Sequence, residues 1–299
     1  MLTLKKLVFI VLMIIAASLG GAKAYIDHQL HLKLNTSIKS VADKVTINYS
    51  EIHTSLLGSV IIHNLQLIAP SHNPVHINAV TIHKAHQFYS GNLPEQIEIS
   101  IEGFQYPISD RATPIPPLMS TLGYAPYYLS LRELRNLGYT VINADIHLKA
   151  KFNGEQMSWS GTIKANIWGN LRFLINLTPV PVLAEWKSWI KKVQLTAFVL
   201  SYTNQGLVNR VFAHLAQRNA MTVDRFKHTL ITKIESDLNQ AKVTLDSSVL
   251  GNLRQFIQTP VTLTIHLQPS PPLTLTLNTL FSTSPKHLGL KMTTTELKE

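Results

Sequence analysis

Residues 139–152 read YTVINADIHLKAKF, and Asn153-Gly154 follows them as the strongest short hairpin signal in the chain. Apolar and polar side chains alternate along this stretch with the period of two that an extended strand requires. One face carries Ile142, Ala144, Ile146, Leu148, Ala150 and Phe152, and the other carries Asn143, Asp145, His147, Lys149 and Lys151. The sequence therefore predicts a two-faced strand that turns back at Asn153-Gly154.

The segments that follow continue this pattern. Residues 155–169 are predicted to return from the hairpin as a second strand. Its buried face is expected to carry Trp159, Ile163, Ala165 and Ile167. Residues 171–177 and 193–202 are predicted as the next two strands, so the region forms an antiparallel meander.

A similar block precedes this one and is rich in β-branched residues. Its predicted strands cover 45–49, 59–69, 75–85 and 96–104. The last of them alternates Ile97, Ile99 and Ile101 with Glu98, Ser100 and Glu102. The two blocks are separated by residues 105–127, which hold five prolines and are interpreted as a connector, a boundary or a lid. Residues 130–138 are predicted as a short helix that Gly138 closes.

The C-terminal third begins with a helical segment over 204–258. Three amphipathic helices are predicted there, over 205–219, 222–240 and 247–258, with N-caps at Thr222 and at Asp246 or Ser247. A β-hairpin is expected over 260–281, formed by strands 261–269 and 273–280. The polar residues from Met292 onward are expected to fray.

This order of elements is not a βαβ alternation. It predicts an α+β fold: a curved, mainly antiparallel sheet made of two meander blocks and a C-terminal hairpin, packed against a cluster of amphipathic helices. The helices are expected to cover the apolar face of the sheet. Residues 25–299 are assigned to this single α+β domain.

The first 24 residues, MLTLKKLVFIVLMIIAASLGGAKA, have the pattern of an export signal. Lys5 and Lys6 precede an apolar and small run of 16 residues, 7–22. Ala22-Lys23-Ala24 has the small-x-small form of a signal-peptidase site. Residues 1–24 are therefore predicted to be a cleaved signal peptide, or an N-terminal membrane helix that anchors the protein with its body in the periplasm.

Composition supports an exported protein and disfavours two classes of function. The chain carries 27 Lys and Arg against 17 Asp and Glu, for a formal charge of +10, and these charges are scattered. A nucleic-acid reader gathers its basic residues on one element, so we expect no nucleic-acid partner. The sequence has no cysteine, which rules out a thiol nucleophile, Cys-ligated zinc and a lipoprotein cysteine.

Residues 49–70, YSEIHTSLLGSVIIHNLQLIAP, resemble exported Gram-negative envelope proteins of the AsmA-like type. In that type a membrane anchor precedes a strand, a short Ser/Leu/Gly turn and a second strand. The matching residues are Leu56, Leu57, Gly58, Val60, Ile62, Leu65 and Leu67. Residues 200–217 and 260–275 are similar to the C-terminal halves of uncharacterised proteobacterial periplasmic proteins. The resemblance implies an envelope location and lipid handling along a curved β groove, and it brings no catalytic residue.

Histidine is the most suggestive chemical feature. Six of the 13 histidines fall between His53 and His86, including the pairs His72/His76 and His83/His86. A metal site needs three or four converging ligands, and an odd separation such as that of His76 and His83 places side chains on opposite faces of a strand. We therefore interpret these residues as surface histidines and predict no metal site, without excluding metal binding by the segment 53–86.

Hydrolase interpretations have little support. The sequence contains neither G-x-S-x-G nor H-E-x-x-H. Asp145 and His147 share a strand face, but no serine is placed by sequence to complete a triad. Glu95, Glu98 and Glu102 are better explained as the solvated side of a strand than as glycosidase carboxylates. The sequence therefore predicts no catalytic residue, no cofactor and no enzyme.

Residues 181–193, PVLAEWKSWIKKV, could form a helix with an apolar stripe beside a basic face. The residues that would place such a helix at a membrane interface are Trp186, Lys187, Trp189, Lys191 and Lys192. The alternative, which we favour, is a crossover helix packed on the sheet with its lysines in water.

The sequence thus predicts a non-enzymatic cell-envelope protein that binds lipid or another envelope component. The alternative is an exported protein-interaction scaffold or effector, which would use the Pro-rich segment 105–127 or the sheet edges. A more distant third is a hydrolase, for which the expected sign is a pocket joining His147, Asp145 and a hydroxyl group.

Overall fold

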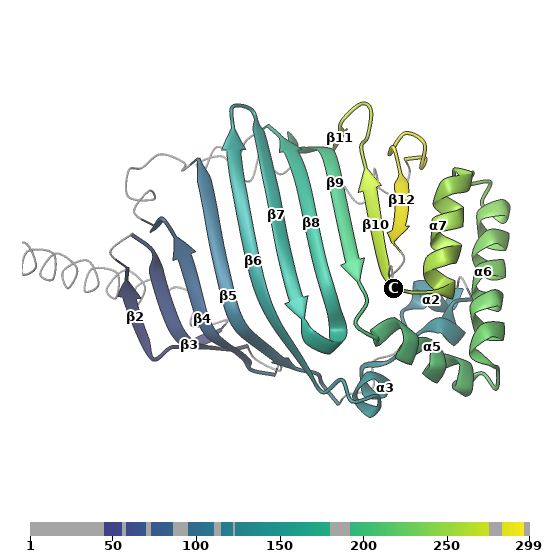
Figure 1. Ribbon diagram of the computed structural model, residues 1–299, viewed down its shortest axis with the longest axis horizontal. Coiled ribbons are helices and arrows are strands. Elements are labelled where there is room, and N and C mark those ends of the chain that lie inside the picture. The colour runs from purple at the N-terminus through teal and green to yellow at the C-terminus, as the bar shows by residue number, and fades with distance from the viewer. Residues whose placement is uncertain are drawn as a thin grey trace, which may run out of the picture.

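A single twelve-stranded sheet dominates the computed structural model, which describes residues 45–55, 58–69, 73–85, 95–110, 115–121, 123–179, 192–274 and 283–295 (Figure 1). The strands are β1 (Thr46–Asn48), β2 (Glu51–Thr54), β3 (Val60–Ile68), β4 (Val75–His83), β5 (Gln96–Pro107), β6 (Val141–Asn153), β7 (Gln156–Ala165), β8 (Gly169–Thr178), β9 (Gln194–Thr203), β10 (Thr262–Leu267), β11 (Leu273–Thr274) and β12 (Lys291–Thr295). Their spatial order is β1-β3-β4-β5-β6-β7-β8-β9-β10-β12, with β2 also on β3 and β11 also on β9. The sheet is antiparallel and open, and the α+β class predicted from the sequence is confirmed.

The two predicted strand blocks form one continuous sheet. β5 pairs directly with β6, from Gln96 opposite Lys151 to Pro107 opposite Val141. The Pro-rich connector therefore leaves the sheet after β5 and returns to it at β6. Its described part contains α2 (Pro117–Thr121) and a 3₁₀ turn, η2 (Ala125–Tyr127), and is followed by α3 (Leu131–Asn136).

The β6–β7 hairpin forms at the predicted place, but its two-residue loop begins one residue later than the Asn153-Gly154 pair suggests. Asn153 pairs with Gln156, so Gly154 and Glu155 are the two loop residues. Gly154 has a φ of +58°, a conformation that glycine adopts without a steric penalty. The turn therefore depends on glycine at its first central position, and Asn153 belongs to the strand.

The predicted C-terminal hairpin is wrong. β11 does not pair with β10: Leu273 lies opposite Leu195 of β9, on the same edge that β10 occupies. β10 and β11 are thus two pieces of one interrupted edge, and the prolines at 269–272 fall in the interruption because they cannot donate ladder hydrogen bonds. The partner of β10 is β12, with Ile265 opposite Met292, so the chain is paired where it was expected to fray.

The predicted helices and their caps are confirmed. They are α5 (Leu207–Arg218), α6 (Val223–Gln240) and α7 (Ser247–Gln258). The Thr222 side chain accepts a hydrogen bond from the amide of Arg225, and Asp246 accepts one from the amide of Ser248. Each cap satisfies an amide that the first helical turn leaves without an internal partner.

Helices α5, α6 and α7 gather at one end of the sheet, beyond β12 (Figure 1). Among the described residues the main helix–strand packing is that of α7 on β12 and β10. Asn252 Oδ1 accepts hydrogen bonds from the amide (3.1 Å) and hydroxyl (3.0 Å) of Thr294, and Phe256 meets Tyr202 of β9 edge-on at 6.5 Å. Among the described elements, the helices therefore cover this face only over the strands from β9 to β12.

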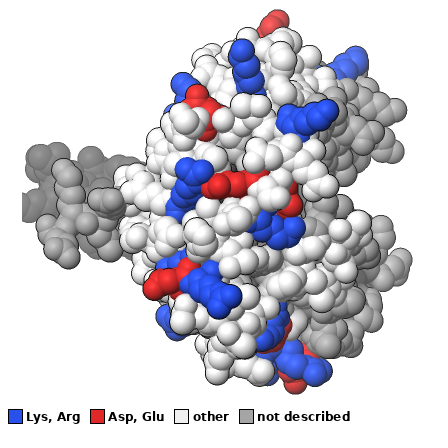
Figure 2. Space-filling model, turned by 90° about the vertical axis from the view of Figure 1, so that its right-hand side faces the viewer, with Lys and Arg blue, Asp and Glu red and all other residues white. Residues whose placement is uncertain are grey.

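Charges of both signs alternate over the helical end of the molecule (Figure 2). Arg254 of α7 contacts Glu235 of α6 at 2.6 Å, and Lys233 contacts Asp237 one turn along α6 at 3.2 Å. These partly solvated pairs contribute little to stability, and they place opposite charges side by side on this surface.

About half of the fully buried apolar residues of the described chain gather in three separate clusters. One lies at the β7–β9 end of the sheet around Met157, Leu177, Val193 and Leu195, and another lies at the opposite edge around Ile52, Val60 and Ala85. The third joins the connector to the helices through Leu215, Ala216 and Phe226. Ile167 was expected to be buried but is 42 % exposed, because the strand ends at Ala165 and a 3₁₀ turn, η3 (Asn166–Trp168), follows.

Alanine substitutions at two glycines test the side-chain packing of this fold. A Cβ added at Gly161 of β7 would lie 2.5 Å from the Phe173 ring, whereas one at Gly251 of α7 would meet no atom within 4 Å. We expect Gly161→Ala to lower the free energy of unfolding by about 1–3 kcal/mol, because the ring must shift. Gly251→Ala should raise it by about 0.5–1 kcal/mol, because alanine favours the helix. Urea unfolding of both variants measures the difference, and equal effects would contradict this packing.

Candidate functional site

The register of the sheet places apolar side chains in continuous rows on one face. Each residue of such a row lies opposite the next one on the neighbouring strand. One row contains Ile52, Ile62, Val80, Ile101, Ile146, Ile163, Leu171, Tyr202 and Leu263. A second row, two residues away and therefore on the same face, contains Val60, Ile82, Ile99, Leu148, Gly161, Phe173, Leu200, Ile265 and Met292. We call this the apolar face.

The row between them points the other way and is almost entirely polar. It contains His53, Ile61, Thr81, Ser100, His147, Thr162, Arg172, Ser201, Thr264 and Thr293. We call this side the polar face. The strict alternation of strand side chains thus extends across the sheet and produces two chemically opposite surfaces.

Most side chains of these two rows are only half-buried, whereas the same face is fully buried farther along β7 to β9, around Met157, Leu177 and Leu195. In the first row only Ile52 is fully buried, and the central residues from Ile62 to Leu263 all keep intermediate exposure. Among the described elements, helix packing reaches this face mainly at β10 and β12. Soluble proteins rarely leave contiguous apolar surface uncovered unless it binds something. The middle of the apolar face is therefore the first candidate binding surface.

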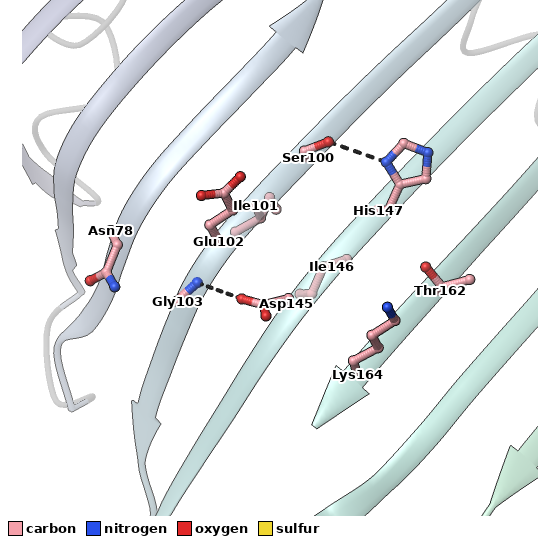
Figure 3. A pocket seen from close by; sticks show the side chains of 10 residues that line it. All are labelled: Asn78, Ser100, Ile101, Glu102, Gly103, Asp145, Ile146, His147, Thr162 and Lys164. Carbon is pink, nitrogen blue, oxygen red and sulfur yellow. Dashed lines mark hydrogen bonds between the residues drawn. The ribbon is translucent and has the colours of Figure 1, made fainter. Parts of the chain in front are cut away.

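The polar face carries a depression of about 530 Å³ over β4 to β7 (Figure 3). It is lined by Asn78, Ser100, Ile101, Glu102, Gly103, Asp145, Ile146, His147, Thr162 and Lys164. The Ser100 hydroxyl lies 3.2 Å from His147 Nδ1 and 2.9 Å from Nε2 of His83. The depression therefore joins His147, Asp145 and a hydroxyl group, the combination expected of a hydrolase.

The geometry around Ser100 nevertheless differs from a catalytic triad. Asp145 Oδ1 accepts a hydrogen bond from the amide of Gly103 (2.9 Å), so this carboxylate is engaged away from the His147 ring. The acid nearest the ring is Glu98, whose Oε1 lies 3.5 Å from His147 Nε2 and whose Oε2 accepts a hydrogen bond from Gln96 at 2.6 Å. The Gly103 amide, already used by Asp145, cannot serve as an oxyanion-hole donor. The hydrogen bonds around Ser100 therefore pair polar side chains of neighbouring strands with one another.

The bulge beside this depression explains its shape. Glu102 and Gly103 of β5 together oppose Asp145 of β6, and Gly103 has a φ of +61°. A Cβ at Gly103 would overlap the Asn78 side chain. The bulge therefore requires glycine for its backbone conformation and for the close approach of β4.

The structure brings together histidines that the sequence left apart. His53 stacks on His63 with ring centroids 5.0 Å apart, and His83 approaches His147 at 6.5 Å. Both pairs form across strands, so they depend on the register and not on spacing within one strand. His76 is exposed on β4, and His72 and His86 lie outside the described residues.

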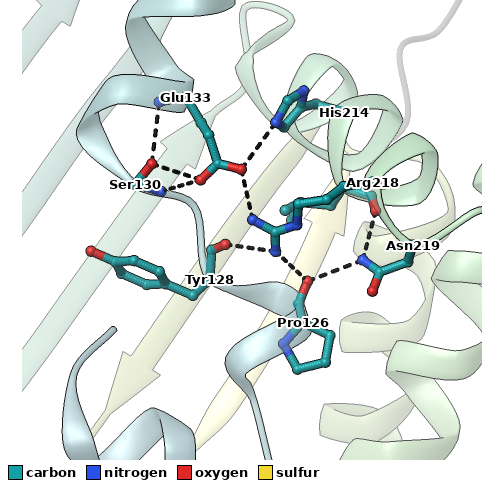
Figure 4. Close-up of polar contacts among 8 residues, drawn as sticks. Pro126, Tyr128, Ser130, Glu133, His214, Arg218 and Asn219 are labelled. Atoms are coloured by element: carbon teal, nitrogen blue, oxygen red, sulfur yellow. Dashed lines mark hydrogen bonds and ion pairs between the residues drawn. The ribbon is translucent and has the colours of Figure 1, made fainter. Parts of the chain in front are cut away.

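A third polar cluster joins the connector to α5 and is centred on Glu133 (Figure 4). Glu133 Oε1 accepts from Arg218 Nη1 at 2.7 Å and lies 3.2 Å from His214 Nε2. Its other oxygen accepts from the amide and hydroxyl of Ser130, at 2.9 and 2.7 Å. Arg218 also donates to the carbonyls of Pro126 and Tyr128. Because these contacts engage both oxygens of Glu133, the cluster holds the connector on the helix.

Partial burial raises the pKa of Glu133, but the hydrogen bonds from Ser130, Arg218 and His214 outweigh it and bring the pKa to about 2. Two residues before Pro126, burial and a hydrogen bond to Asp237 raise the pKa of Tyr124 to about 12. Tyr124 also lies under the Lys233 ammonium at 4.7 Å. Polar and aromatic contacts thus attach the described connector to α5 and α6.

Two predicted membrane elements fall on parts of the chain outside the described residues. They are the leader, residues 1–24, and most of the interfacial helix, including Trp186, Lys187, Trp189 and Lys191. Lys192 is described and exposed. No helix of the described residues is long and apolar enough to span a membrane.

Because of the Glu133 cluster, the free energy of unfolding is expected to depend on pH. The folded-state pKa of Glu133 lies below the ordinary value of 4.5, so its contribution is complete above that pH and is lost as the pH falls toward 2. We expect Glu133→Gln to lower the free energy of unfolding by roughly 2 kcal/mol at pH 7. The deficit relative to the wild type should shrink between pH 4.5 and 2, as urea unfolding at each pH can measure. Glu155→Gln, in the exposed β6–β7 turn, is the matched control, and a pH-independent deficit at Glu133 would contradict the assignment.

Comparison with known proteins gives a match to a family whose description names no activity. A family described as "Uncharacterized protein" matches residues 155–295, just under half of the chain. The match runs from the β6–β7 turn to the end of β12, and thus includes α5 to α7 and the strands on either side of them. None of the curated proteins matches the chain. The chain is thus similar, over this region, to a family of uncharacterised proteins.

Proposed function

We propose that this protein is a non-enzymatic cell-envelope protein, held at a membrane or exported by its N-terminal segment, that binds lipid acyl chains on the apolar face of its sheet. The observation that carries the proposal is the pair of apolar rows, which cross the sheet and remain half-exposed between its two edges. Acyl chains match this surface because they are apolar, flexible and long enough to contact several strands.

Three further observations support the proposal. Residues 1–24 have an export or anchor pattern, which would place the apolar face near a lipid source. The resemblance of residues 49–70 to AsmA-like proteins implies a curved β groove of the same kind. The acid nearest His147 at the Ser100 site is Glu98, whose carboxylate is shared with Gln96 and Lys149, an arrangement that favours cross-strand polar pairing over hydrolysis.

The alternative, a protein-interaction scaffold, receives less support from the connector. Pro126 and Tyr127 of this segment are engaged with α5 and α6: Tyr127 packs on Phe226 at 5.4 Å, and the carbonyl of Pro126 accepts a hydrogen bond from Arg218, as does that of Tyr128 just beyond the segment. A partner that needs these residues would have to displace the helices. The sheet edge at β1 and β2 would then be the remaining place for a strand-adding partner.

The proposal is tested by the lipid that the protein carries. We expect the full chain, purified from the envelope fraction, to yield acyl lipids on organic extraction and mass spectrometry. Ile163→Gln, in the middle of the apolar face, should lower the lipid content roughly tenfold, since burial of such a side chain contributes about 1.5–3 kcal/mol.

Lys164→Gln is the matched control, because Lys164 is the next residue of the same strand and is exposed. It should leave the lipid content unchanged, and circular dichroism confirms that both variants fold. A wild-type protein that is consistently empty would refute the proposal. Equal lipid content in the two variants would show that any lipid resides elsewhere.

A further inference from the structure

Three potential metal ligands converge at the sheet edge opposite to the end where α5, α6 and α7 pack. Glu51 and His53 are two residues apart on β2 and share a face, while the residue between them, Ile52, is buried on the apolar side. His63 lies directly opposite Glu51 on β3. One ligand atom from each of the three side chains lies within 4.8 Å of the others. The cluster lies on the polar face, away from the apolar rows.

These side chains have no competing partner in the described part of the chain. The two imidazoles stack at 5.0 Å, and no hydrogen bond or ion pair engages them or the Glu51 carboxylate there. The second histidine pair differs, because Ser100 bridges His83 and His147, and Glu98 contacts His147. The ligand atoms of Glu51, His53 and His63 are therefore available to a cation, whereas those of the second group are occupied.

The ligand set selects a class of metal. Two imidazoles and one carboxylate suit Zn²⁺, Cu²⁺ or Ni²⁺, whereas Mg²⁺ and Ca²⁺ require mostly oxygen ligands. Zinc binds such ligands at about 2.0–2.2 Å, which places neighbouring ligand atoms roughly 3.3 Å apart in a tetrahedron. Glu51 is exposed and both histidines are half-exposed, so their side chains have room to change rotamer and bring the ligand atoms closer than 4.8 Å.

The electrostatic surroundings permit a cation despite the basic chain. The β4 residues opposite His63 and Ile61 are Ala79 and Thr81, and neither is charged. Glu51 supplies one negative charge directly to the site. An ion there meets a carboxylate on one side and uncharged neighbours on the other.

We propose that Glu51, His53 and His63 form a binding site for a divalent transition-metal ion of the Zn²⁺ class, with the remaining coordination positions open to water. Bound metal would join β2 to β3 through side chains. It would thereby stabilise an edge strand of only four residues. The proposal is independent of lipid binding, because its ligands and the apolar rows lie on opposite faces.

The test uses the untagged full chain, stripped with chelator and titrated with ZnCl₂ by isothermal calorimetry. We expect one equivalent of Zn²⁺ to bind and to raise the melting temperature. His53→Gln and Glu51→Gln should each weaken binding by about tenfold or more, and His63→Ala by at least as much. If His63→Ala weakens the edge strand itself, the conservative variants His53→Gln and Glu51→Gln still test metal binding.

His266→Gln is the matched control, because His266 is a lone histidine on β10, remote from the cluster. It should bind Zn²⁺ as the wild type does. The proposal is overturned if the wild type binds no stoichiometric metal. It is equally overturned if His53→Gln and His266→Gln lower the affinity by the same factor, since that result describes adventitious binding to surface histidines.

Discussion

The structure depends on one constraint, the cross-strand register that keeps apolar side chains on a single face over consecutive strands. A slip of one residue at any strand pair would move Ile, Leu and Phe side chains to the polar face and bring Ser, His and Lys into the apolar rows. Two devices protect the register. The glycine turn at Gly154 sets the β6–β7 pairing, and the bulge at Gly103 shifts β5 against β6 by one residue where Asp145 accepts the amide hydrogen bond.

The same register bears on how the core of this sheet is distributed among the described residues. In most α+β domains, helices bury one whole face of the sheet. Here α7 packs on β12 and β10, and the buried clusters of the described residues lie at the ends of the sheet and among the helices. The central apolar rows contribute to stability only in part, because half-exposed side chains gain only part of the transfer free energy. Binding of an apolar ligand would complete that burial, which links the fold to the proposed function.

Sequence reasoning succeeds where the signal is local. The period of two predicts β3 to β9, Thr222 predicts the start of α6, and the pair Asp246 and Ser247 predicts the start of α7, where the structure selects Asp246 as the cap. It fails where the structure of a segment depends on pairing with a strand that is distant in the sequence. β12 is short and polar, and it becomes a strand because β10 and α7 flank it; β11 joins β9 because β12 already occupies the free side of β10. The His53–His63 pair was missed for the same reason: the alternation places Glu51 and His53 on one face, but only the β2–β3 register adds His63.

The two edges of the open sheet are protected in different ways, and this difference gives the metal site a physical role. At one edge, α7 packs on β12, and its Asn252 bonds the amide of Thr294. At the other edge, β1 and β2 pair with β3 as two short pieces of three and four residues, interrupted between Asn48 and Glu51. A broken edge discourages further strands from adding, but it also leaves β2 with few ladder bonds. Side-chain ligation across β2 and β3 would compensate for those missing bonds without restoring a continuous edge. A metal clip is therefore the kind of stabilisation that this edge can accept while remaining closed to strand addition.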